Sequence, residues 1–365
     1  MKRSNVFPLA RLAVVAAVLL SACGGGSSNS GGALSCSGLK VGAVVHFRGP
    51  YTEEILAGTK AAADECKAGY QDAGPSAIDP PTEIKEFQDL MQTGVKAITT
   101  VAYPSDIWVK PIDNANNAGV PVGTYDVASP ASLETVHVGP RNLDIGKAMA
   151  DAYTNTLGSN ASTATGSVVL GICFPGLDVL EARVTGFKNE MQKVAPKMTI
   201  LGAFDTTFDP AKNYAAWQQL VSAHRDAKAF AGVCENDLNA LEKIKAKDAS
   251  AKYFIESVGI NAEALQGIKS GVGGAAIGQQ PFLQGYVAMK MLLLKVEGKA
   301  NIKRGWVNTG VEVVTSENAD QVLARENSLS SGPSQSLAFY KSTLDKIFAD
   351  PAAAVTSLGD YVSTS

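Results

Sequence analysis

Three polar residues, Glu235, Asn236 and Asp237, follow a run of small apolar residues that ends at Cys234. Side chains of these types can transfer protons in catalysis, cap the start of a helix, or hydrogen-bond a ligand. The apolar run is typical of a buried strand, and the residues that follow have a helical pattern. This stretch alone therefore leaves a catalytic site, a helix cap and a ligand contact all open.

Similar polar clusters with interleaved aromatic residues follow the other apolar runs. They are HFRGPY (46–51), AYPSD (102–106, with Tyr103), YDVAS (125–129), FPGLD (174–178), DTTFD (205–209), ENDLN (235–239), INAE (260–263) and QQPF (279–282). Planar groups that both donate and accept hydrogen bonds suit sugar hydroxyls, and aromatic faces suit the apolar face of a sugar ring. The alternative for each Asp or Asn is a helix N-cap, because each cluster also begins a predicted helix.

Strands and helices alternate around these clusters. The predicted strands are 39–45, 96–102, 121–126, 166–173, 198–204, 227–234, 253–259 and 273–279, and the predicted helices are 52–66, 82–93, 143–157, 178–194, 210–224, 237–247, 261–270 and 282–297. Nearly continuous apolar strands between helices indicate parallel sheets covered on both faces. The pattern restarts after residues 137–142, so we expect an α/β fold of two doubly wound parallel-sheet lobes. Ligands of such lobes bind at the carboxyl ends of the strands, where the polar clusters stand.

The N-terminus predicts export. Residues 1–22 combine basic residues with the apolar stretch 12–20, which is too short to remain as a membrane span. LSAC (20–23) matches a bacterial lipobox, so we expect Cys23 to carry a lipid anchor; an ordinary signal peptide with an incidental cysteine is the alternative. Residues 23–37 are rich in Gly and Ser and are expected to be a flexible tether.

Five segments, in order along the chain, resemble the type I periplasmic binding proteins of the ribose/galactose class, which serve sugar ABC transporters. They are DLMQTGVKAITTVAYPSD (89–106), NANNAGVPVGTYD (114–126), HVGPRNLDIGKAMAD (137–151), FAGVCENDLNALEKI (230–244) and AAIGQQPFLQGYVAMK (275–290). VAYPSD and TSENADQV (315–322) are also similar to the autoinducer-2 and rhamnose-type branch. The resemblance implies two lobes that close about a hinge on a small polyhydroxylated ligand, and an ABC permease as partner.

The resemblance also implies ligand-binding residues. Asp126 and Asn236 match the sugar-binding Asp and Asn, Gln279 matches a hinge Gln, and Tyr51 and Phe208 match two aromatic positions. Asn261 replaces an Asp, Val127 stands where an Arg is common, and the helix Arg falls near Arg183, so the ligand need not be ribose. The full expected set is Asp126, Asn236, Gln279, Asn261, Tyr51, Phe208, Arg48, Arg141, His46, Arg183, Glu235 and Tyr103. Arg48 and Arg141 are included as sources of the missing guanidinium, and Glu235 either reaches the ligand or lines the rim.

The N-terminal signals and the resemblance together indicate how the chain divides. The expected parts are a signal peptide (1–22), a tether (23–37), an N-terminal lobe (38–140 plus 280–311), a C-terminal lobe (141–279 plus 312–325) and a C-terminal extension (326–365). About three crossings, near 138–142, 278–282 and 309–315, are expected to form the hinge. Within the extension, 328–336 reads as a linker and 337–348 as an amphipathic helix packed on a lobe.

Four cysteines remain in an exported chain and suggest two disulfides. Cys173 and Cys234 close the first and third strands of the second lobe, which are neighbours in a flavodoxin-like strand order. Cys36 precedes the first strand and Cys66 ends the helix after it. We therefore expect the pairs Cys36–Cys66 and Cys173–Cys234, with free buried thiols as the alternative.

Other classes of function are disfavoured. The formal net charge of −3 argues against nucleic acid as a partner. No nucleophile-elbow or zinc-protease motif occurs, and GVGGAA (271–276) precedes a strand, where a dinucleotide fingerprint must follow one. We therefore expect a monomeric binding protein rather than an enzyme, with neither cofactor nor metal. A receptor that presents a sugar-like signal to a membrane sensor is the main alternative, and a nucleoside or amino-acid binding protein is a lesser one.

Overall fold

The computed structural model describes residues 34–362, which belong to one compact unit. The expected signal peptide, Cys23 and most of the expected tether lie outside the described residues. No helix within residues 34–362 combines the length and the apolar character that a membrane span requires.

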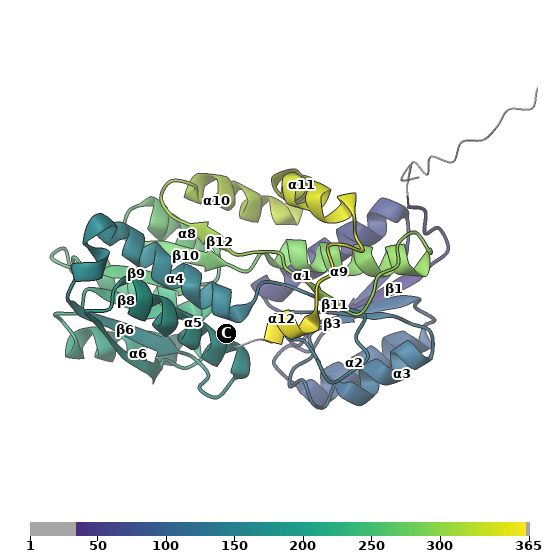
Figure 1. The fold of residues 1–365 in the computed structure, drawn as a ribbon, viewed down its shortest axis with the longest axis horizontal. Coiled ribbons are helices and arrows are strands. Elements are labelled where there is room, and N and C mark those ends of the chain that lie inside the picture. Colours follow the sequence, from purple (N-terminus) through teal and green to yellow (C-terminus); the bar gives the residue numbers. More distant parts are fainter. Residues whose placement is uncertain (1–33, 363–365) are drawn as a thin grey trace, which may run out of the picture. The chain divides into compact units, whose positions relative to one another are not determined.

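The N-terminal lobe is built on a six-stranded sheet in the order β11-β5-β4-β3-β1-β2. Its strands are β1 (Lys40–Val44), β2 (Gly69–Ala73), β3 (Ala97–Thr100), β4 (Val122–Tyr125), β5 (Val136–Val138) and β11 (Gly305–Val307), all in parallel pairs. Alternate residues of β1 face opposite sides: Val41 and Ala43 pack toward α1 (Pro50–Cys66) and α9 (Pro281–Val296), and Val44 packs toward α2 (Pro80–Gln92) and α3 (Val109–Asn117). The sheet is thus covered on both faces, as its continuous apolar strands predict (Figure 1).

The C-terminal lobe repeats the plan with the order β12-β10-β9-β8-β6-β7. Its strands are β6 (Gly166–Ile172), β7 (Met198–Asp205), β8 (Ala229–Gly232), β9 (Phe254–Val258), β10 (Ala275–Gly278) and the antiparallel β12 (Glu312–Val314). One face packs on α4 (Asn142–Leu157) and α5 (Asp178–Val194), and the other on α6 (Pro210–Ala223), α7 (Glu235–Lys245), α8 (Ala262–Lys269) and α10 (Ala319–Ser328). The expected two doubly wound lobes are confirmed.

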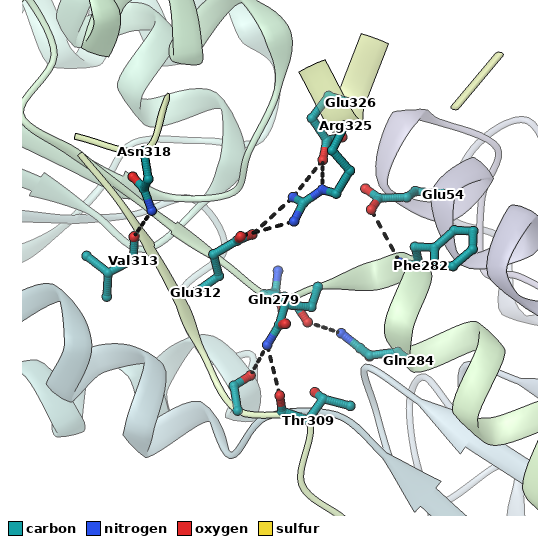
Figure 2. Close-up of polar contacts among 12 residues, drawn as sticks. Glu54, Gln279, Phe282, Gln284, Thr309, Glu312, Val313, Asn318, Arg325 and Glu326 are labelled. Atoms are coloured by element: carbon teal, nitrogen blue, oxygen red, sulfur yellow. Dashed lines mark hydrogen bonds and ion pairs between the residues drawn. The ribbon is translucent and has the colours of Figure 1, made fainter. Parts of the chain in front are cut away.

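The chain passes between the sheets after β5, between β10 and α9, and between β11 and β12. Gln280, at a left-handed φ of 58°, donates from its side chain to the carbonyls of Thr309 and Gly310, both at 2.9 Å. Gln284 donates to the carbonyl of Gln279 at 2.7 Å (Figure 2). Side-chain hydrogen bonds thus link two of the crossings to each other.

A fourth passage runs through the C-terminal extension. Helix α10 packs on α8 of the C-terminal lobe, whereas α11 (Ser334–Ala349) packs on α9 of the N-terminal lobe. Tyr340, Leu344 and Ile347 of α11 enter the N-terminal core, as the amphipathic pattern predicts. The stretch expected to be a linker, 328–336, is mostly helical: a 3₁₀ turn at Leu329–Ser331 follows α10, and α11 already begins at Ser334. The chain therefore crosses between the lobes once more between α10 and α11, and the extension from α11 onward packs on the N-terminal lobe.

Both expected disulfides are present. Cys36 is bonded to Cys66 and Cys173 to Cys234, with Cα atoms 5.0 Å and 6.1 Å apart. The second pair joins the ends of β6 and β8, which are adjacent in the sheet. The strand-order argument for this pairing is confirmed.

Candidate functional site

A cavity of about 450 Å³ lies where the carboxyl ends of both sheets meet. Its walls are His46, Phe47, Tyr51, Ile78, Tyr103, Asp126 and Val127 from the N-terminal lobe, and Cys173, Phe174, Leu177, Val179, Leu180, Arg183, Phe208, Cys234, Glu235 and Gln279 from the C-terminal lobe. This volume is in the range of small-molecule sites, and the mixture of apolar walls with a few polar groups is typical of them. Of the residues expected to bind ligand, eight line this cavity: His46, Tyr51, Tyr103, Asp126, Arg183, Phe208, Glu235 and Gln279.

Asp126 is held in an unusual backbone conformation directly after β4. Its φ of 61° lies in the left-handed region, which Asp tolerates better than most side chains but which still costs about 1–3 kcal/mol. The N–H of Asp126 donates to Oε1 of Gln284 at 3.2 Å, and its carbonyl accepts from the Tyr361 hydroxyl at 3.2 Å. Two side chains from remote parts of the chain thus fix the backbone that carries the Asp126 carboxylate.

Arg183 supplies the positive charge of the cavity and is only 5% exposed. Its Nε donates to Oδ1 of Asn142 at 2.9 Å, and its terminal nitrogens donate to the carbonyl of Val233 at 3.0 Å and to Oε1 of Gln279 at 2.7 Å. Burial lowers the pKa of the guanidinium, and the charge of Asp126 raises it. A guanidinium stays protonated in proteins, so Arg183 presents fixed donors to the cavity.

Two glycines bring α5, and with it Arg183, close to α4. A Cβ on Gly146 would lie 1.9 Å from the Arg183 carbonyl oxygen, and one on Gly186 would lie 2.1 Å from the Leu143 carbonyl oxygen. No larger residue fits this close backbone approach. The short distance allows Asn142, at the start of α4, to accept from Arg183.

Buried polar atoms without partners point into the same region. His46 Nδ1 and the Tyr51 hydroxyl make no hydrogen bond of ordinary geometry, although the hydroxyl lies beside Asp126 and Gln284. Burial lowers the pKa of His46 more than the charge of Asp126 raises it, and burial raises the pKa of Tyr51 well above its usual value. Both groups are therefore neutral near pH 7. Since buried polar atoms normally have hydrogen-bond partners, a bound molecule with its own donors and acceptors would supply the missing hydrogen bonds.

Glu235, the first residue of α7, lies on the C-terminal lobe and gives the cavity a second carboxylate besides that of Asp126. Burial, with a smaller contribution from the charge of Glu326, raises its pKa to about 7. Glu235 thus changes charge near neutral pH.

Aromatic rings from both lobes meet over the cavity. Phe47 lies edge-on to His46 with ring centroids 4.7 Å apart, and its ring is 6.4 Å from that of Phe208 in the other lobe. Phe174 and Phe208 are about half exposed, at 51% and 50%. Exposed aromatic rings can pack on the apolar face of a sugar ring, and carboxylates and a guanidinium can bond its hydroxyls.

Four expected ligand residues are not brought to this cavity. Arg48 pairs with Glu53 and Asp72, and Arg141 pairs with Asp144 at 2.8 Å. Asn261 caps α8 by accepting from the N–H of Ala264 at 3.0 Å, and Asn236 donates to the carbonyl of Phe208 at 3.2 Å. For Asn261 the structure shows the helix cap that the sequence left open. Asn236 contacts the loop that carries Phe208.

Asp237 is fully buried and has a structural role. Its Oδ2 accepts from the N–H of Cys234 at 3.0 Å, and Oδ1 accepts from Trp217 Nε1 at 2.7 Å and from Asn213 Nδ2 at 2.8 Å. Asp237 thus forms one half of a capping box at the start of α7 and joins α6 to α7. Glu235, Asn236 and Asp237 therefore have different roles. Glu235 lines the cavity, Asn236 contacts the loop that carries Phe208, and Asp237 is a buried helix cap.

Two cavity residues, Phe47 and Phe174, and two residues that support the cavity from outside, Gln284 and Tyr361, were not expected from the sequence. Phe47 and Phe174 belong to polar clusters that were recognised, so their aromatic type was an available signal. Gln284 lies inside a long apolar helix, and Tyr361 lies 235 residues beyond Asp126. No local pattern points to either of these two.

A second cavity, of about 470 Å³, adjoins the first and shares Tyr51, Glu235 and Gln279 with it. Its polar groups are mostly paired: Arg325 donates to both oxygens of Glu312 at 3.0 Å and to Glu326 at 2.7 Å (Figure 2). Because those charges already satisfy each other, this space is a weaker candidate for ligand capture. Within residues 34–362 no group of three or more His, Cys, Asp or Glu side chains is arranged to hold a metal ion.

The fold and the cavity between two lobes define a binding protein of the periplasmic type. Residues 41–300 match the periplasmic binding protein domain family, and the chain belongs to this family. It is similar to the ribose import binding protein RbsB of Haemophilus influenzae, with 29% identity over 245 residues that cover 67% of this chain and 80% of that protein. RbsB of Bacillus subtilis is also 29% identical, over 58% of this chain and 66% of its own length.

Solved structures show the same fold. An ABC transporter solute binding protein from Burkholderia graminis, in complex with D-arabinose, aligns with a TM-score of 0.70 and 23% identity. The alignment covers 77% of this chain and 96% of that one. The likeness to the type I sugar-binding class that the sequence motifs indicate is confirmed.

Proposed function

We propose that this protein captures a neutral monosaccharide or related polyol between its lobes and delivers it to an ABC importer. The observation that carries the proposal is the cavity at the carboxyl ends of both sheets, where Asp126, Arg183 and unpaired buried polar atoms face aromatic rings. The similarity to ribose import binding proteins, and to a solute binding protein solved with D-arabinose, supports a monosaccharide as the ligand. An anionic sugar would bring its charge close to Asp126 and Glu235, so we expect a neutral ligand.

Capture would proceed by hinge closure. Asp126 stands on one lobe and Arg183 and Glu235 stand on the other, so a sugar that bonds to both sides favours the closed form. Closure would replace water by charge-assisted hydrogen bonds and by stacking on Phe47 and Phe208. The closed form is the state expected to dock on the permease.

A thermal-shift screen of the purified protein tests the proposal. The panel contains D-ribose, D-xylose, D-arabinose, D-fructose and D-galactose, with D-glucuronate, adenosine and L-leucine as comparison ligands. A sugar present at about 1,000 times its Kd would stabilise the folded state by about 4 kcal/mol, which raises Tm by several degrees. Stabilisation by glucuronate, adenosine or leucine alone would exclude a neutral-sugar function.

Export and anchoring are a separate part of the proposal. We propose that Cys23 becomes the lipidated N-terminus and that the mature protein acts as a monomer outside the cell membrane. Incorporation of labelled palmitate into the wild type but not into a Cys23→Ser variant is the expected result. Equal labelling of both would contradict the anchor, and light scattering at a dimer mass would contradict the monomer.

A further inference from the structure

The C-terminal segment beyond α11 returns to the centre of the molecule. Thr356 forms an antiparallel bridge with Trp306 of β11, through backbone hydrogen bonds of 2.8 Å and 3.0 Å. The short helix α12 (Leu358–Val362) then packs beside β11 (Figure 1). This segment lies outside residues 41–300, the part of the chain that matches the family.

Apolar contacts fix the position of Tyr361 in α12. Leu358 packs with Ala128 and Trp306. The Tyr361 ring lies 4.2 Å from the ring of His137 and 5.8 Å from that of Trp306, measured between centroids. These contacts hold the ring directly behind the loop that follows β4.

The Tyr361 hydroxyl reaches groups of both lobes. It donates to the backbone carbonyl of Asp126 at 3.2 Å. The Asn142 side chain lies beside the same hydroxyl, and Asn142 accepts from Nε of Arg183 at 2.9 Å. The hydroxyl thus bonds to the backbone of Asp126 in one lobe and lies next to Asn142, which accepts from Arg183 of the other lobe.

We infer that Tyr361 is a positioning residue for ligand capture, an inference that rests on the proposed sugar-binding function. Asp126 occupies a left-handed conformation that costs free energy even for Asp, so surrounding contacts must maintain it. The Gln284 side chain accepts from the N–H of Asp126, and the Tyr361 hydroxyl donates to the Asp126 carbonyl. The hydroxyl thus sets the direction of the Asp126 carboxylate while standing outside the cavity wall.

Tyr361→Phe tests this role, because it removes the hydroxyl and keeps the ring against His137 and Trp306. Tyr340→Phe is the matched control, since the Tyr340 hydroxyl lies in the same extension, is buried and has no partner. Two quantities are measured: hydrogen exchange of peptides covering residues 124–129 without ligand, and the Kd of whichever of D-ribose, D-xylose, D-arabinose and D-fructose binds the wild type most tightly.

We expect Tyr361→Phe to speed exchange at 124–129 and to raise the Kd roughly 3- to 10-fold, the range of one lost hydrogen bond, while Tm stays within about 2 °C of the wild type. Tyr340→Phe should change neither exchange nor Kd. Wild-type exchange at 124–129 in Tyr361→Phe, a Kd equal to that of the control, or a large fall in Tm would each overturn the inference. If none of the five neutral sugars of the thermal-shift panel binds the wild type, the monosaccharide proposal fails, and the exchange measurement alone decides the role of Tyr361.

Discussion

Replacing Arg325 by Met should destabilise the protein far more than the loss of an ordinary surface ion pair. Arg325 is 3% exposed and lies between Glu312 of β12 and Glu326 of α10 (Figure 2). The rings of Phe339 and Tyr340 lie 4.5 Å and 5.1 Å from its guanidinium carbon. Met preserves the apolar contacts with the rings. It leaves buried carboxylates without their counter-charge.

The magnitude follows from burial. Removing one partner of a buried ion pair costs about 3–5 kcal/mol, and for a protein of this size that lowers Tm by about 4–7 °C. Arg48→Met is the control, because Arg48 also pairs with two carboxylates, Glu53 and Asp72, but its side chain is 33% exposed. Exposed pairs contribute about 0–1 kcal/mol, so the control should lose little.

The loss in Arg325→Met should also depend on pH. Burial raises the pKa of Glu54 well above its usual value, and it raises the pKa of Glu326 as well, while the positive charge of Arg325 lowers both. Without that charge both pKa values rise further, so the folded state binds more protons than the unfolded state. The destabilisation is therefore largest above the folded pKa values and fades as the pH falls toward that of unfolded Glu, about 4.3.

Melting of both variants and the wild type at pH 8 and pH 5, with the disulfides intact, tests this reasoning. We expect a large deficit for Arg325→Met at pH 8 and a smaller one at pH 5. A deficit at pH 8 no greater than that of Arg48→Met would show that the buried charges are not the cause. A deficit of the same size at both pH values would refute the linkage argument.

Three further predictions concern the cavity and the Cys173–Cys234 disulfide beside it. Asp126→Asn keeps a side chain that tolerates the left-handed conformation but removes the charge, so we expect an unchanged Tm and a Kd about 10- to 100-fold higher by calorimetry; an unchanged Kd would remove Asp126 from the site. Because the pKa of Glu235 is about 7 and its ionised form is the better acceptor, sugar affinity should increase from pH 6 to pH 8 in the wild type and be flat in Glu235→Gln; parallel pH profiles would contradict this assignment. Replacing Cys173 and Cys234 by Ala should lower the free energy of unfolding by about 2–4 kcal/mol in denaturant titrations, and an unchanged midpoint would show that this disulfide does not stabilise the fold.

Strongly patterned elements were predictable from the sequence. Helix 178–194 has the bounds that its periodicity indicates, and most strands differ from expectation by only a few residues. Strand β2 was not expected because its residues, GYQDA, are polar and mostly exposed at the edge of the sheet. Strands β5, β11 and β12 have three residues each, which is too short for a periodic signal.

The candidate site was predictable as a region but not residue by residue. The carboxyl ends of the strands were the correct place to look, and Asp126 and Glu235 stand there. Successive helical side chains point about 100° apart, so whether Glu235 or Asn236 faces the cavity depends on the rotation of α7 about its axis. The buried hydrogen bonds of Asp237 to Trp217 and Cys234 set that rotation.

The sequence by itself indicated the two lobes and the edge of each sheet where polar residues gather, and an assumed strand order added the expected pairing of the cysteines. Those features depend on local periodicity, which can be read from one sequence, and on general rules for how strands are connected. Only the tertiary structure decided that Arg183 reaches the cavity whereas Arg141 pairs with Asp144, and that Tyr361 supports Asp126 from 235 residues away. These choices depend on which groups packing brings within hydrogen-bond distance, and that distance is a property of the folded chain rather than of any stretch of its sequence.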